Sequence, residues 1–289
     1  MPIDISIIII SFNGIEFIDD CLNSAIKSID EVSSEIIVVD NASHDGTIQL
    51  LENKYPNIKL IKNSKNLGFA AAVNIGLANA IGRFILLLNQ DIKIIGPAIP
   101  QLTKRLTMSD KIGIIGPKFI GFDGKLQKSC RAFPKYMDLL YEFTGLSYIF
   151  PKSKIFSQWK MGWFDHEREL EVDQPMGAAM MFRHELVDKI GIFDESFRIF
   201  FNDVDFCRRA KEAGFVNLYY PIAVIMHYGG GSINKMKPRM IFESHYSMFR
   251  YFKKYNKSIF SLPLLYFWGG KLFIAAIFRC IYHLIREKL

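Results

Sequence analysis

The first third of the chain alternates buried-strand patterns with helical patterns, and this alternation restricts the fold more than any other feature of the sequence. Runs of apolar residues, many of them β-branched, predict buried strands at residues 5–10, 35–40 and 84–88 and a short strand at 58–61. Helical patterns separate them at residues 17–26, 47–54 and 70–80. Strands that alternate with helices in this way predict a mostly parallel sheet with helices on both faces.

Polar residues follow three of these strands, namely Ser11 to Gly14, Asp40 with Asn41, and Asn89 to Asp91. Ligands bind at the carboxyl ends of strands in such sheets, so we expect a site at this edge. Asp40 is able to accept hydrogen bonds from a nucleobase or a ribose, and Asp91 to bind a divalent cation on a diphosphate. Each is equally able to cap a turn, and that alternative stays open for either residue alone.

Composition and motifs exclude several classes of protein. The formal net charge of +7 over 289 residues suits an anionic partner such as a nucleotide, a diphosphate or an acidic membrane face. The 4 cysteines are scattered without a C-x-x-C motif, which argues against a structural zinc site or a disulfide framework and indicates a reducing compartment. The N-terminal residues lack a basic n-region, so no signal peptide is expected. No dinucleotide-binding or P-loop glycine motif is present.

Four motifs carry a resemblance to a known family. The segments S-F-N-G, I-I-V-V-D-N-A-S-H-D-G-T, N-L-G-F-A-A-A-V-N-I-G and L-L-L-N-Q-D occur in this order. They resemble the nucleotide-sugar half of inverting family 2 glycosyltransferases with the GT-A fold, within the rhamnosyltransferase-like branch of bacterial surface-polysaccharide synthesis. The resemblance extends over residues 3–255. It implies an α/β GT-A-like domain over residues 1–234, with a nucleotide-sugar half (1–124) and an acceptor half (125–234), followed by a helical C-terminal tail (235–289).

The resemblance also implies roles for individual residues. Asp40 would contact the nucleobase, and Asp91 stands where the metal-binding D-x-D motif of the family ends, with Asn89 in the place of its first aspartate. His227, in an H-x-G-G-G-S segment, would lie near the metal or the diphosphate. The implied cofactor is a divalent cation, Mg²⁺ or Mn²⁺. The remaining residues expected along the nucleotide sugar are Ser11, Asn13, Asn66, Gly68, Asn74 and Asn89.

The segment from Phe200 to Arg209 holds the candidate catalytic base. Asp205 and Arg209 are four residues apart, so on a helix they can pair, which leaves Asp203 free to face elsewhere as a general base. Taken alone, the pattern also suits a solvated helix start with acids near its N-terminus. The family pattern E-D-x-D, with an arginine four residues later, matches Asp203 to the base. Asn202 stands where the family usually has Glu.

The second half of the chain supports fewer predictions. Residues 125–170 mix aromatic and basic side chains and are interpreted as an acceptor-binding or membrane-facing flap, or as simple lid packing. Residues 172–183 predict a loop and a buried strand, in which Gly177 admits a close approach. By the resemblance this segment is the floor of the acceptor site.

The last 55 residues predict a helical tail. Residues 235–257 combine basic and aromatic side chains, as in a helix on an anionic membrane surface. Residues 258–289 are strongly apolar, but Lys271 and Arg279 interrupt the roughly 18 uncharged residues typical of a spanning helix. We expect a helical tail that lies on a surface, with a packed helix pair and a membrane span as alternatives.

Together these observations predict an inverting, metal-dependent glycosyltransferase. The resemblance favours a dTDP- or UDP-linked donor, rhamnose as a candidate sugar and a glycan or lipid-linked acceptor, with no nucleic acid partner. The expected location is cytoplasmic, peripheral on the cytoplasmic face of the membrane. One alternative is a non-catalytic, membrane-associated scaffold of the same fold, suggested by carboxamides at Asn89 and Asn202. Another is an RNA-binding module, which rests on residues 235–257 alone.

Overall fold

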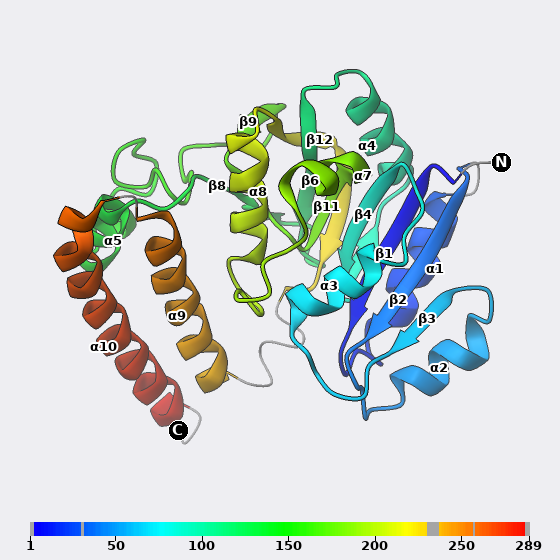
Figure 1. The fold of residues 1–289 in the computed structure, drawn as a ribbon, viewed down its shortest axis with the longest axis horizontal. Helices are drawn as coiled ribbons and strands as arrows, with labels where there is room; N and C mark the ends of the chain where they lie inside the picture. Colours follow the sequence, from blue (N-terminus) through cyan, green and yellow to red (C-terminus); the bar gives the residue numbers. More distant parts are fainter. Residues whose placement is uncertain (1–2, 30–31, 230–236, 257, 287–289) are drawn as a thin grey trace.

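The computed structural model describes residues 3–29, 32–229, 237–256 and 258–286. In this part of the chain, a sheet of 10 strands forms the centre of the molecule, with strands β3-β2-β1-β4-β11-β6-β12-β5 side by side, β7 beside β6 and β9 beside β12 (Figure 1). The strands of the first half are β1 (Ile5–Ser11), β2 (Ser34–Asp40), β3 (Lys59–Lys62), β4 (Phe84–Asn89), β5 (Ile92–Ile94) and β6 (Ile112–Ile120). Those of the second half are β7 (Leu126–Gln127), β9 (Leu170–Val172), β11 (Ala179–Arg183) and β12 (Val216–His227). A separate pair joins β8 (Cys130–Arg131) to β10 (Gln174–Pro175).

The predicted parallel strands are confirmed. Strands β2 and β4 both pair with β1 in parallel, and β3 pairs with β2 in parallel. Their register places Ser11 opposite Asp40, and Ile10 opposite Asn89. The polar residues that follow the three strands therefore meet at one edge of the sheet, as the alternation predicts. Strand β11 is antiparallel to both of its neighbours, β4 and β6, and joins the two halves of the sheet.

Helices cover both faces of the sheet, because successive strand residues point to opposite sides. Ile5, Ile7 and Ile9 pack in one cluster with helices α1, α2 and α4, whereas Ile8 and Ile10 pack in another with α3, α7 and α8. Both faces of these strands are therefore buried, which explains why their residues form continuous apolar runs. These helices are α1 (Ile18–Ser28), α2 (Thr47–Lys54), α3 (Phe69–Leu77), α4 (Ala98–Thr107), α7 (His184–Ile190) and α8 (Asn202–Glu212).

Strand β6 continues through Gly116 and Pro117, although proline lacks the N–H that a strand within a sheet normally donates. Pro117 pairs with Tyr220 of β12, and the register between the two strands shifts directly beyond that pair, as it also does between Val216 and Asn217. A Cβ at Gly116 would lie 2.4 Å from the Cβ of Pro175, so this glycine admits the adjacent β10 segment.

The C-terminal tail is a helix pair that stands beside the sheet domain (Figure 1). Helix α9 (Lys237–Tyr255) leads through a short 3₁₀ turn (Ile259–Ser261) into α10 (Leu262–Arg286), and α10 packs against α9. Residues 125–170 include α5 (Tyr136–Phe143) and α6 (Leu146–Ile149). Tyr136 of α5 stacks on Phe252 of α9, with ring centroids 4.6 Å apart. The aromatic segment therefore packs against the tail.

Helix α10 is continuous through Lys271 and Arg279, which were expected to interrupt the apolar run. Both side chains are exposed, so their charges stay outside the helix contacts. Among the described residues, Leu262–His283 is the one helical segment long and apolar enough to cross a membrane, a test of length and composition that core helices of soluble proteins also pass. The packed helix pair, one of the alternatives left open by the sequence, describes the arrangement seen.

Candidate active site

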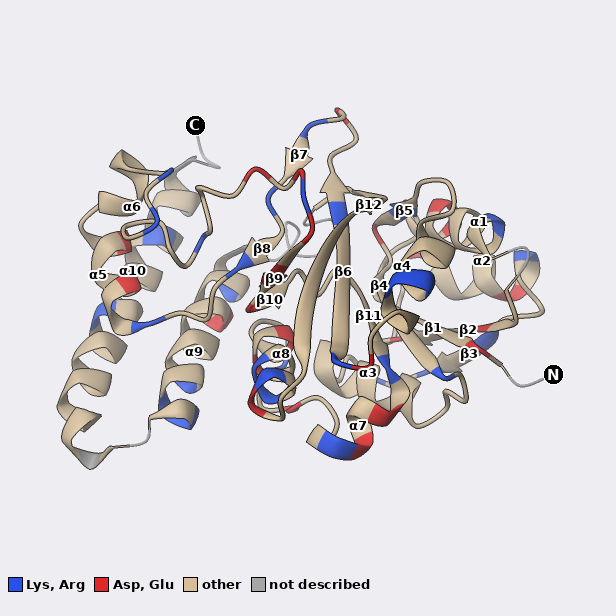
Figure 2. Ribbon diagram, turned by 90° about the horizontal axis from the view of Figure 1, so that it is seen from above, with Lys and Arg blue, Asp and Glu red and all other residues tan. Residues whose placement is uncertain are grey.

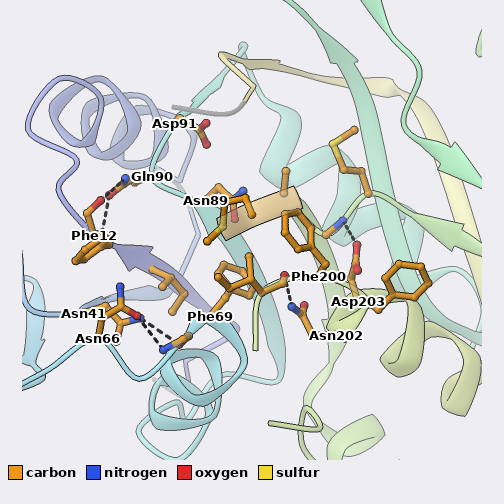
Figure 3. A pocket seen from close by; sticks show the side chains of 18 of the residues that line it. Phe12, Asn41, Asn66, Phe69, Asn89, Gln90, Asp91, Phe200, Asn202 and Asp203 are labelled. Atoms are coloured by element: carbon orange, nitrogen blue, oxygen red, sulfur yellow. Dashed lines mark hydrogen bonds between the residues drawn. The ribbon is translucent and has the colours of Figure 1, made fainter. Parts of the chain in front are cut away.

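A pocket of about 370 Å³ opens at the edge of the sheet where the predicted polar strand ends meet (Figure 3). Asn41, Asn89 and Asp91 reach it from the ends of β2 and β4, and Asp203 reaches it from α8. Its other lining residues are Ile10, Phe12, Asn66, Gly68, Phe69, Gln90, Met176, Gly177, Ala178, Ile199, Phe200, Phe201, Asn202, His227 and Met240.

Asp203 is held in the first turn of α8 by three hydrogen bonds. Its Oδ2 accepts the Nε2–H of Gln174 at 2.6 Å and the backbone N–H of Gly177 at 3.0 Å, while Oδ1 accepts the N–H of Val204 at 2.9 Å. Burial raises the pKa of this carboxyl, although the hydrogen bonds act in the opposite direction. The result is a fixed carboxylate with a strengthened tendency to take a proton.

Backbone geometry helps to set this position. Phe201, the N-cap of α8, has a left-handed φ of 67°, an uncommon conformation for a bulky residue. The side-chain amide of Asn202 donates to the carbonyl of Ile199 at 2.6 Å, which fixes the turn that leads into the helix. Strained backbone of this kind clusters at functional sites in proteins.

Gly177 leaves room for Asp203. A Cβ at Gly177 would lie 2.7 Å from the Cβ of Asp203 and 2.8 Å from its Oδ2, closer than real contacts allow. Glycine is therefore required for Asp203 to receive the N–H of residue 177.

We expect Gly177→Ala to lower the rate of a reaction that uses Asp203 as its base by about 10²-fold, the loss that a misplacement of about 1 Å can cause. The added methyl group must push the Asp203 carboxylate from its place. Steady-state kinetics checks the rate, and nucleotide binding should stay at the wild-type level because the strand ends are untouched. An unchanged turnover number would show that the position of Asp203 is not critical.

Asp205 anchors the same helix. It is fully buried, and its Oδ2 accepts the Nε–H of Arg209 at 2.9 Å, as the spacing of four residues predicts. Its Oδ1 accepts the hydroxyl of Tyr255 at 2.7 Å and lies 2.5 Å from Nζ of Lys254, both on α9. Lys254 also pairs with Asp194 at 2.7 Å. The helix that carries Asp203 is thereby tied to the tail.

Asp91 and His227 face each other across the pocket rim, with Oδ1 of Asp91 3.6 Å from Nε2 of His227. The backbone carbonyl of His227 accepts the side-chain N–H of Gln127 at 2.7 Å, so the oxygen of that amide is left to accept Nδ1–H of His227 at 3.1 Å. This arrangement assigns the proton to Nδ1 and presents the lone pair of Nε2 to Asp91.

The donor set suits a divalent cation. Two electron-rich atoms, Asp91 Oδ1 and His227 Nε2, converge on one point, and the buried Oδ1 of Asn89 has no hydrogen-bond partner among the described residues. Carboxylate and amide oxygens match the preferences of both Mn²⁺ and Mg²⁺, and an imidazole nitrogen suits a transition metal such as Mn²⁺ better than Mg²⁺. The described residues hold no cluster of three or more His, Cys, Asp or Glu side chains, so any such cation would rely on Asn89 or on the substrate for further oxygens.

Comparison with known proteins identifies the family. Residues 6–163, more than half of the chain, match the sequence profile of glycosyl transferase family 2. The chain belongs to glycosyltransferase family 2. A curated relative from Mycobacterium tuberculosis, N-acetylglucosaminyl-diphospho-decaprenol L-rhamnosyltransferase, is 23% identical over 252 residues, which cover 82% of this chain and 80% of the relative. The hexosyltransferase Agl10 of low-salt glycan biosynthesis in Haloferax volcanii is 27% identical over 214 residues, 72% of this chain and 62% of the relative.

Solved glycosyltransferases share the fold. The mannosyltransferase PcManGT of Pyrobaculum calidifontis, in complex with GDP-Man and Mn²⁺, aligns with a TM-score of 0.59 at 16% identity over 96% of this chain and 73% of that one. TarS 1–349 of S. aureus in complex with UDP aligns with a TM-score of 0.55 at 18% identity over 83% of this chain. The chain spans 65% of TarS 1–349 and 39% of the longer TarS chain. The predicted GT-A-like fold, a mostly parallel sheet flanked by helices, is thus confirmed.

Several residues expected along the nucleotide sugar of this family 2 glycosyltransferase do line the pocket. Asn66, Gly68 and Asn89 are among them, as are Asp91 and His227 from the expected metal site. Asn66 Oδ1 accepts the N–H of Gly68 at 2.9 Å, which shapes the turn before α3. The glycines and serine that follow His227, at positions 230–232, lie outside the described residues.

Other expected residues do not line the pocket. Asp40 is fully buried, and its two oxygens accept the N–H and hydroxyl of Ser43 at 2.8 and 2.6 Å, which is the turn-capping role left open by the sequence. Ser11 donates its hydroxyl to Gln90, and Asn13 accepts the N–H of His44 through Oδ1. These three residues shape the strand ends and are not among the pocket-lining residues.

Asn74 is likewise absent from the pocket. Its amide is satisfied by the backbone of Phe193, donating to the carbonyl at 2.9 Å and accepting the N–H at 3.0 Å, and it also donates to Glu195. It links α3 to the loop before α8, and its expected place along the nucleotide stays a prediction.

Sequence reasoning missed Gln174 and Met240. Gln174 donates a hydrogen bond to Asp203, and its only signal in the sequence was its place in the segment expected to form the floor of the acceptor site. Met240 of α9 lines the pocket, a contact that depends on how the tail docks. Neither residue belongs to a motif that could have marked it.

Proposed function

We propose that this glycosyltransferase is an inverting, metal-dependent enzyme that moves a sugar from a nucleotide-diphosphate donor to a lipid-linked or glycan acceptor during cell-surface polysaccharide synthesis. The observation that carries the proposal is the position of Asp203, whose pKa is raised by burial, in one pocket with the Asp91–His227 pair. A fixed base at one side and a cation-binding pair at another match the two demands of this reaction (Figure 3).

In the proposed reaction, Asp203 takes the proton of an acceptor hydroxyl while that oxygen forms a bond to the anomeric carbon. The bond from this carbon to the diphosphate breaks at the same time, and its electron pair leaves with the nucleoside diphosphate. Attack from the face opposite the leaving group inverts the configuration. A divalent cation held by Asp91, His227 and Asn89 would neutralise charge on the diphosphate.

The donor is expected to lie over the ends of β1, β2 and β4, where Phe12, Asn41 and Asn66 form the wall away from Asp203. Among donors we favour dTDP- or UDP-linked sugars. The activity for which the Mycobacterium tuberculosis relative is named suggests rhamnose as the sugar and a lipid-linked diphosphate as the acceptor. A peripheral place on the cytoplasmic face of the membrane, through the tail, fits such an acceptor.

A thermal-shift screen of UDP, dTDP, GDP and CMP, with and without Mn²⁺, tests the donor site. One nucleotide should stabilise the protein only when Mn²⁺ is present, by about 2.7 kcal/mol at a concentration 100 times its dissociation constant. Asp91→Asn should remove the Mn²⁺-dependent part, because it weakens the cation site without changing the shape of the side chain.

Asp20→Asn is the matched control, since it removes the same charge from an exposed residue that lies outside the pocket. It should respond to nucleotide and Mn²⁺ as the wild type does. The absence of a response to any nucleotide in the wild type would contradict the proposal and favour the scaffold alternative.

A further inference from the structure

A second cavity lies between the two tail helices, separate from the active site. It has a volume of about 610 Å³, larger than the catalytic pocket. Aromatic and aliphatic side chains make up most of its wall, with three polar or charged residues on α9. The lining residues are Arg239, Phe242, Glu243, His245, Tyr246, Phe249, Tyr266, Gly269, Gly270, Leu272, Phe273 and Ala276. We call this cavity the tail groove.

Two consecutive glycines of α10 make the groove possible. A Cβ at Gly269 would lie 2.8 Å from two ring carbons of Phe249, so this glycine lets the helices approach each other. A Cβ at Gly270 would meet nothing within 4 Å, so open space lies beside it. A glycine in a helix interior destabilises the helix relative to alanine. Close packing against Phe249 accounts for Gly269, whereas a space kept open for a ligand accounts for Gly270.

The groove begins next to the active site. Arg239 belongs to the groove, and the following residue, Met240, lines the catalytic pocket. The first turn of α9 therefore separates the two cavities. Arg239 is exposed at this end and can bind a phosphate with its guanidinium group. Glu243 lies one turn further along the groove, and burial lowers the pKa of His245, which keeps that ring neutral.

The outer surface of α10 continues the apolar character of the groove. Its exposed side chains include Phe267, Phe273, Ile274, Phe278, Ile281 and Tyr282, of which Phe278 and Tyr282 are each 67% exposed. Helix α10 is the element furthest from the sheet on this side (Figure 1). A contiguous apolar surface of this kind marks an interaction site, so a hydrocarbon chain could enter the groove from an apolar phase. In Figure 2, most residues of α9 and α10 are uncharged, and basic residues occur at only a few positions on these helices.

We propose that the tail groove binds the prenyl chain of a lipid phosphate acceptor, with Arg239 at its phosphate and the acceptor sugar directed past Met240 towards Asp203. The inference rests on the proposed function, because it names the acceptor of that same reaction. A chain in the groove would bring the acceptor to the pocket from the side opposite the nucleotide wall formed by Phe12 and Asn41.

Titration calorimetry of the full chain with farnesyl phosphate, below its micelle concentration, tests the proposal. Farnesyl phosphate should bind at least tenfold more tightly than isopentenyl phosphate, which has the same phosphate but too short a chain. Gly270→Leu should weaken binding at least tenfold by filling the groove, whereas Phe278→Ser, on the outer surface of α10, should leave it unchanged. Arg239→Gln should weaken the binding of farnesyl phosphate severalfold but not that of farnesol.

Three results would overturn the inference. One is equal binding by the wild type and Gly270→Leu, and another is tighter binding of dodecyl phosphate, which would assign the groove to straight-chain bilayer lipids. The third is a dimer, detected by light scattering, that Gly270→Leu dissociates, since the surface would then belong to a second copy of the chain.

The nucleotide screen separates failure of this inference from failure of the proposed function. A Mn²⁺-dependent nucleotide response without farnesyl phosphate binding would reject the groove assignment and leave the transferase proposal in place. Farnesyl phosphate binding without any nucleotide response would reject the donor site. Gly270→Leu should keep the wild-type nucleotide response, which also shows that the variant is folded.

Discussion

Asp203→Asn is expected to abolish sugar transfer while nucleotide binding stays at the wild-type level. The amide has the shape of the carboxylate, and its single oxygen can still accept the hydrogen bonds from Gln174 and Gly177. It cannot accept the proton of the acceptor hydroxyl. Removal of a positioned general base typically costs about 10²–10⁴-fold in rate. Measurement of product formation beside the thermal-shift response to nucleotide and Mn²⁺ separates the two properties, and retained transfer would exclude Asp203 as the base.

The pH dependence of the wild-type enzyme is a second test of Asp203 as the base. The base must be deprotonated to act, and burial raises the pKa of Asp203 above its usual value of about 3.9. The ratio kcat/KM should therefore fall as the pH drops through this raised pKa. Any residual rate of Asp203→Asn should lack that acidic limb. A limb that persists in the variant would assign it to another group.

Asp205→Ala is expected to lower the free energy of unfolding by about 3 kcal/mol, the lower end of the range for removing one partner of a buried ion pair. The lower end applies because Arg209 and Lys254, which lose their partner, keep side-chain exposures of 19% and 33% and can be partly solvated. The hydroxyl of Tyr255 also loses its acceptor. The melting temperature should fall by about 6–12 °C.

Glu212→Gln is the matched control for this change. Glu212 lies on the same helix and also pairs with an arginine four residues away, Arg208, but its side chain is 48% exposed. Exposed pairs contribute less than about 1 kcal/mol, so its loss should hardly change the melting temperature. Equal effects of the two substitutions would show that Asp205 does not anchor the helix.

The sequence predicted those features that depend on local pattern. The β-branched apolar runs identified the parallel strands, and the register of β1 with β2 and β4 then brought Asn41, Asn89 and Asp91 to one pocket. The spacing of four residues predicted the contact between Asp205 and Arg209. Each of these inferences needs only a helical or strand period and the direction of a strand.

The features that it missed depend on contacts between distant segments. The side-chain amide of Asn74 is bound by the backbone of Phe193, 119 residues further along the chain. The hydroxyl of Tyr255 donates a hydrogen bond to Asp205, which lies 50 residues earlier in the chain. Contacts of this kind depend on how distant segments pack, and that of Tyr255 depends on the docking of α9, so a local helical or strand pattern does not predict them.

The position of β11 in the sheet prevents a division of the protein into two independent halves. This strand follows Gln174 and Gly177, which hold the base, and it pairs with β4, whose end carries Asn89, the start of the proposed cation site. A cut at residue 124, between the two expected halves, would turn β4 from an interior strand into an open edge. The proposed donor site and the segment that holds Asp203 are therefore joined through one continuous hydrogen-bonded sheet. Any opening that admits substrates must come from loops and the tail, since a hinge between lobes would break the sheet.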